Sequence, residues 1–151
     1  MNTTADFVVH APDESIRLVV EAKSTPNDSA TWAAELRRNL VMHGAVPPAP
    51  YFLLALPQHF YLWKDAPATE AVLPDYQVAA QAVLPLYLRE FSVPLDQLSG
   101  AGWEFVVAAW LDDLVGGPLR PDLPATVRHW LIDSGLYAAV RNGSVTAQAT
   151  A

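Results

Sequence analysis

Cysteine is absent from this sequence, and long apolar runs are absent as well. With no Cys among 151 residues, zinc ribbons, redox dithiols and cysteine nucleophiles are excluded, and a reducing compartment is allowed. No stretch approaches the roughly 18 uninterrupted apolar residues of a membrane span, and the first thirty residues lack the basic and then apolar pattern of a signal peptide. We therefore expect a cytoplasmic protein that does not enter a membrane.

Basic residues are scarce and unevenly placed. The chain has 9 Lys and Arg against 16 Asp and Glu, and its net charge of -7 argues against coating a nucleic acid, because phosphate contacts need cations. Residues 1–64 hold five basic and six acidic residues (net -1), whereas residues 65–151 hold four basic and ten acidic residues (net -6). A site for a polyanion is therefore expected in the first part.

The length and the apolar content predict one folded domain. Hydrophobic residues make up 52% of the chain, and a domain of this size buries roughly 70% of its unfolded surface without help from disulfides or metals. We expect a single domain over residues 1–151. It would comprise a core of sheet and helix (1–65), a helical C-terminal extension (66–142) and a frayed tail (143–151).

Strand patterns are concentrated in the first 65 residues. The runs 6–10 and 16–22 are short and β-branched, and the turn-forming segment between them predicts an antiparallel hairpin. Residues 30–43 carry apolar side chains four apart and predict a helix, while the apolar runs 51–56 and 60–63 predict two further strands.

Helical patterns dominate the remainder. We expect a helix over 75–90 that is kinked at Pro85, a helix with a strong apolar stripe from 103 to 114, and a last helix over 127–140 that is interrupted near Gly135. The predicted fold class is α/β, with a mixed β-sheet flanked by helices.

Three polar side chains of the predicted hairpin are candidate residues of a functional site. Glu21 and Lys23 are two residues apart on the second strand, so both side chains point to the same face. Asp6 begins the first strand, and the start of one antiparallel strand lies beside the end of the next. Two carboxylates and an amine are therefore expected to converge.

The spacing of these three residues, called the trio below, fits a metal site, and it also fits an ordinary structural role. Two carboxylates suit Mg²⁺, which takes one or two protein carboxylates and keeps several waters. A neighbouring Lys could then position a water or neutralise charge on a phosphate oxygen. The same spacing also fits a surface ion pair between Glu21 and Lys23, or a hydrogen-bonded cap on a strand end. The spacing alone leaves these alternatives open.

The segment ADFVV (residues 5–9), followed by VVEAK (residues 19–23), resembles the acidic residue, hairpin and E-x-K of the PD-(D/E)XK nuclease superfamily. The likeness is to the nuclease-like domains related to the R subunit of type I restriction enzymes. The helix over 33–40 and the strand pair over 51–65 are also similar to that family. The resemblance covers about 60 residues.

This resemblance implies a restriction-endonuclease-like fold and a metal-dependent deoxyribonuclease that hydrolyses DNA phosphodiester bonds. Asp6 and Glu21 would be ligands of Mg²⁺ or Mn²⁺, and Lys23 would position the water. Arg37 and Arg38, the only adjacent basic pair, are candidate contacts to the DNA backbone, although a solvated helix face explains them equally well.

Two departures from the family favour a second hypothesis. Relatives usually place a helix and a strand before the first acidic residue, and that helix often supplies another carboxylate, whereas only residues 1–5 precede Asp6 here. Glu35 and Asn39 also replace the Gln and Tyr of some relatives. The alternative is a catalytically inactive nuclease-fold module for binding or assembly. It would act as a homodimer, or through a protein partner that contacts the C-terminal helices.

Overall fold

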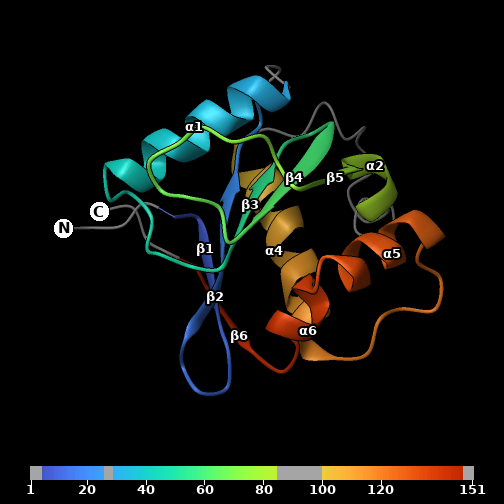
Figure 1. The fold of residues 1–151 in the computed structure, drawn as a ribbon. Helices are drawn as coiled ribbons and strands as arrows, with labels where there is room; N and C mark the ends of the chain where they lie inside the picture. The colour runs from blue at the N-terminus through green and yellow to red at the C-terminus, as the bar shows by residue number, and fades with distance from the viewer. Residues whose placement is uncertain (1–4, 26–28, 85–99, 148–151) are drawn as a thin grey trace.

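A six-stranded mixed β-sheet forms the centre of the protein, and helices cover both of its faces (Figure 1). The structure is a computed structural model, and it describes residues 5–25, 29–84 and 100–147. The strands lie in the order β5-β4-β3-β2-β1-β6. Their bounds are β1 Phe7–His10, β2 Ile16–Ala22, β3 Tyr51–Ala55, β4 His59–Lys64, β5 Tyr76–Ala79 and β6 Ser144–Ala147.

The predicted hairpin is confirmed. Strands β1 and β2 pair antiparallel, with Phe7 opposite Val20 and Val8 opposite Val19. Continuing this register by one residue places Asp6 opposite Glu21. The predicted central strand is confirmed as well, because β3 lies between β2, to which it is parallel, and β4, to which it is antiparallel. The α/β class with a mixed, helix-flanked sheet is therefore the observed architecture.

The two faces of the sheet bury separate apolar cores. Helix α1 (Ala30–Met42) covers one face, where it packs over side chains such as Val19 and Leu54. Helices α2 (Ala80–Val83), α4 (Gly100–Gly116), α5 (Ala125–Asp133) and α6 (Leu136–Val140) cover the other (Figure 1). Trp103 and Trp110 of α4 are buried in this second core, so the apolar stripe of α4 packs inside the molecule.

Helix α1 begins where its sequence predicts. The Ser29 side chain accepts a hydrogen bond from the backbone N–H of Trp32 at 3.1 Å, which caps the first turn of the helix. The interruption near Gly135 is also confirmed. Gly135 separates α5 from α6 and has a φ of 80°, a conformation that glycine adopts without strain.

Two expectations for the C-terminal part are wrong where the structure forms strands, although residues 80–83 of the expected helix do form helix α2. Residues 76–79 form strand β5 rather than the start of a helix, because their backbone pairs with β4 and Val78 enters the core. Residues 144–147 form strand β6 rather than a frayed tail, because β1 would otherwise leave its outer edge unpaired. The predicted kink at Pro85 lies outside the described residues.

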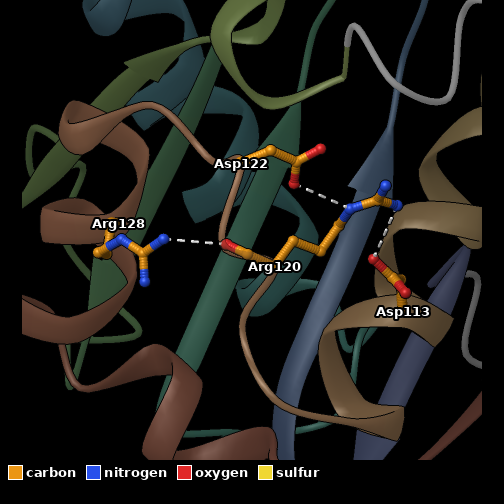
Figure 2. Close-up of polar contacts among 4 residues, drawn as sticks. All are labelled: Asp113, Arg120, Asp122 and Arg128. Carbon is orange, nitrogen blue, oxygen red and sulfur yellow. Dashed lines mark hydrogen bonds and ion pairs between the residues drawn. The ribbon is translucent and has the colours of Figure 1, made fainter.

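Polar contacts hold the connection between α4 and α5. The Arg120 guanidinium lies between Asp113 of α4 (3.7 Å) and Asp122 of the loop (3.3 Å), as Figure 2 shows. Arg128 of α5 donates a hydrogen bond to the Arg120 carbonyl oxygen at 3.0 Å. One arginine therefore links the end of α4 to the loop, and a second links the loop to α5.

Among the described residues, no helix combines the length and the apolar character that crossing a membrane would require.

Candidate functional site

Asp6, Glu21 and Lys23 meet at one end of the hairpin. The backbone N–H of Ala22 donates a hydrogen bond to Asp6 Oδ2 at 2.8 Å, which holds the Asp6 side chain against the end of β2. The Glu21 carboxyl group lies near enough to Asp6 for the charge of Asp6 to raise its pKa. Lys23 Nζ lies 3.5 Å from Glu21 Oε2. The expected convergence of two carboxyl groups and an amine is therefore present.

Glu21 is the unusual member of the trio because it is buried. Its side chain is 1% exposed, and Oε1 has no hydrogen-bond partner among the described residues. The Lys23 side chain, by contrast, is 43% exposed. An exposed ion pair would leave both partners in water, so the ordinary interpretation as a surface salt bridge does not describe Glu21. A buried carboxyl oxygen without a partner requires a proton or a cation.

The surroundings of Glu21 favour its neutral form when no cation is bound. Burial and the nearby negative charge of Asp6 together raise the pKa of Glu21 from 4.5 to about 7, and the Lys23 ammonium offsets only part of this effect. Near neutral pH the carboxyl is therefore poised between protonated and charged states, which is typical of functional sites as well as of buried pairs.

Glu104 is a further ionisable residue near the trio, and the sequence alone did not indicate its position. It lies in the first turns of α4, near enough to Asp6 for the charge of that carboxyl group to act on it. Partial burial, followed by the charge and hydrogen bonding of Asp6, raises the pKa of Glu104, while Lys23 acts in the opposite direction. The charge of Asp6 therefore acts on both the buried Glu21 and the exposed Glu104.

The placement of Glu104 depends on a long-range contact. The backbone N–H of Gly100 donates a hydrogen bond to Ser24 Oγ at 3.2 Å, which ties the start of α4 to the chain just beyond β2. An acidic residue inside an apolar helix pattern gives no sign of which strand end that helix will cover. Glu104 lies on the exposed side of the stripe formed by Trp103, Val106 and Val107, where an acidic residue is ordinary, so the sequence carries no signal for its role.

The donor set fits a hard divalent cation, although it is not a complete cage. No group of three or more His, Cys, Asp or Glu side chains in the described part of the chain is arranged to hold a metal ion. Mg²⁺, however, usually takes one or two protein carboxylates and completes its shell with water. Asp6 and Glu21 would supply two, and the unpartnered Glu21 Oε1 is the atom that a cation would satisfy.

The two arginines named as candidate DNA contacts lie in different environments. Arg37 is 5% exposed, and its guanidinium donates to the carbonyl oxygens of Pro67 (3.0 Å) and Ala66 (3.1 Å). It therefore holds the loop after β4 against α1 and presents almost no surface to a ligand. Arg38 is partly exposed and donates to the Thr69 carbonyl oxygen at 3.2 Å.

No family model matches this sequence, and neither the curated proteins nor the solved structures contain a match. The interpretation of the site therefore depends on its own geometry and on the motif resemblance.

Proposed function

We propose that this protein is a Mg²⁺- or Mn²⁺-dependent nuclease of the PD-(D/E)XK type that hydrolyses DNA phosphodiester bonds. The observation that carries the proposal is the buried Glu21 carboxyl beside Asp6, with one oxygen unpartnered and the other facing Lys23. The order of elements supports a restriction-endonuclease-like fold, since a hairpin ending in E-x-K leads into a helix and then into a strand parallel to β2.

Each residue of the trio has a distinct role in this proposal. Asp6 and Glu21 would hold the cation. A bound divalent cation supplies charge neutralisation and lowers the pKa of a bound water. The Lys23 ammonium group would donate a hydrogen bond to the phosphate oxygen on which negative charge develops. Its exposure leaves this ammonium accessible to a substrate.

A catalytically inactive module is the second candidate, and the charge of the molecule favours it. The net charge is -7, and the Arg37 guanidinium is already bonded to two backbone carbonyls. In this alternative Glu21 stays protonated, the Glu21–Lys23 pair is structural, and a protein partner contacts the C-terminal helices. The two candidates differ in whether the trio binds a cation and acts on DNA.

Cleavage of plasmid and single-stranded DNA in Mg²⁺ or Mn²⁺ tests the proposal. Wild-type protein should cleave at least one of these substrates, and EDTA should abolish cleavage. Lys23→Ala should lower the rate about 100- to 1,000-fold, because the loss of one preorganised donor has effects of this size. Glu21→Gln should lower the rate at least as much, because it removes a ligand charge without changing shape.

Glu70→Gln is the matched control, because Glu70 is an exposed acid in the loop between β4 and β5 and is not a member of the trio. Its rate should equal that of the wild type. Intact DNA in every metal-containing reaction, with folded protein, would reject the nuclease and favour the binding module. Equal cleavage by the wild type and Lys23→Ala would reject the assigned role of Lys23.

A further inference from the structure

A surface hollow of about 390 Å³ lies directly beside the trio. It is lined by Lys23, Ser24, Thr25, Trp32 and Leu36. Lys23 thus belongs both to this hollow and to the proposed catalytic site. A ligand whose phosphate meets the Lys23 ammonium would place its neighbouring groups in the hollow.

The walls of the hollow are anchored. The backbone N–H of Lys23 donates to the Ala55 carbonyl oxygen at 3.1 Å, which fixes the chain as it leaves β2. Trp32 lies in the first turn of α1, where Ser29 caps its N–H, and its side chain packs partly against the core under α1. A partly exposed indole held in this way loses little conformational freedom when a ligand stacks on it.

The lining matches the parts of a nucleotide. Trp32 offers an aromatic face and Leu36 an aliphatic one, Ser24 and Thr25 carry hydroxyl groups, and Lys23 brings a positive charge to the rim. Nucleobases stack on aromatic side chains regardless of their sequence, and each such contact is worth about 1–3 kcal/mol. The base faces inside a duplex are covered by their neighbours, so only an unpaired strand presents them.

The scarcity of available positive charge also favours an unpaired strand over a duplex. A protein that follows a duplex by its phosphates needs many available cations. Here the net charge is -7, the Arg37 guanidinium is buried and bonded to carbonyls, and Arg17 lies 4.0 Å from Asp13. Stacking therefore has to supply the affinity that the phosphate contacts do not.

We propose that this hollow binds a nucleobase of a single-stranded nucleic acid, next to the phosphate that Lys23 contacts. The position of that phosphate rests on the proposed nuclease function, whereas the stacking on Trp32 does not. The preferred substrate is then an unpaired strand, DNA or RNA, rather than a duplex.

Fluorescence anisotropy in EDTA and low salt tests base binding without cleavage. The probes are fluorescein-labelled twelve-nucleotide oligothymidylate, oligouridylate of the same length, an abasic DNA strand and the corresponding DNA duplex. Wild-type protein should bind at least one of the two base-containing strands more tightly than the abasic strand and the duplex. Comparing oligothymidylate with oligouridylate shows whether the DNA strand or the RNA strand binds more tightly.

Two substitutions of Trp32 separate stacking from packing. Trp32→Leu keeps an apolar side chain without an aromatic face, and it should weaken binding of the base-containing strand about 5- to 150-fold while leaving the abasic strand unchanged. Trp32→Phe should stay within a few-fold of the wild type. Thermal unfolding of both variants confirms that they are folded. Equal binding of abasic and base-containing strands, or wild-type affinity in Trp32→Leu, would overturn the inference.

A cleavage assay on the same strands in Mg²⁺ distinguishes the two proposals. Base-dependent binding without cleavage would reject the nuclease and retain the nucleobase site. Cleavage that is equally fast in Trp32→Leu and the wild type would retain the nuclease and reject the nucleobase site.

Discussion

Glu21 is the residue on which the account of the site depends. A strand that enters a core as Leu18-Val19-Val20 has no packing reason to continue with a buried carboxyl group. The sequence indicated the convergence with Asp6 and Lys23, because strand period and antiparallel pairing are local rules. It did not indicate the burial, which comes from neighbouring elements packed around the end of β2.

The raised pKa of Glu21 predicts a pH-dependent instability. Below pH 4.5 the carboxyl is protonated in both folded and unfolded chains, so it has no effect. As pH rises from 4.5 to about 7, the unfolded chain loses this proton first, and the folded state becomes less stable by up to roughly 3 kcal/mol. Glu21→Gln removes the ionisation and can donate to Asp6. The variant should therefore be more stable than the wild type at pH 8, with little difference at pH 4.5.

Urea unfolding at these two pH values, in EDTA, measures the difference. Glu70→Gln again serves as the control, and its stability relative to the wild type should not depend on pH in this range. A Glu21→Gln variant that gains no stability between pH 4.5 and pH 8 would show that the Glu21 carboxyl is not held in a site that disfavours its charge.

At the scale of elements, the junction between α5 and α6 shows how one backbone conformation positions two helices. Gly135 has a φ of 80°, and a Cβ atom there would lie 2.7 Å from Tyr51 Oη. Tyr51 is buried on β3 and donates a hydrogen bond to the Ser134 carbonyl oxygen at 2.8 Å, so it cannot move away freely. The junction is thereby fixed against the sheet.

Gly135→Ala should consequently destabilise the protein by about 1–3 kcal/mol, the usual cost of an alanine in a left-handed conformation next to a crowded neighbour. Gly116→Ala is the control, because a Cβ at this last residue of α4 meets nothing within 4 Å. The control should be neutral or slightly stabilising. Urea unfolding compares the two, and equal stabilities would contradict the role given to Gly135.

Elements with strong local signals were predictable, and those defined by distant partners were not. The hairpin, α1, β3, β4 and the stripe of α4 each carry a clear period or turn signal. Strand β5 has only four residues next to a helix, and β6 consists of small polar and β-branched residues near the end of the chain. Both are strands because a neighbouring edge needs pairing, and the sequence cannot indicate which edges remain open.

At the scale of the whole molecule, the sheet joins the two ends of the described chain. Strand β6 pairs with β1 along four residues, and α4, α5 and α6 cover the face opposite α1 (Figure 1). These helices bury the apolar side chains on that face within the chain itself. In this way α4 brings Glu104 to the hairpin end.

The central claim is that Asp6 and Glu21 together bind a divalent cation. Crystals soaked in Mn²⁺ and measured near the manganese absorption edge test it most directly, with Glu21→Gln crystals as the comparison. We expect an anomalous peak in contact with carboxylate oxygens of both Asp6 and Glu21 in the wild type, and no peak there in the variant. Wild-type crystals at saturating Mn²⁺ with no peak between these two side chains, and with Glu21 still facing Lys23 alone, would contradict the account.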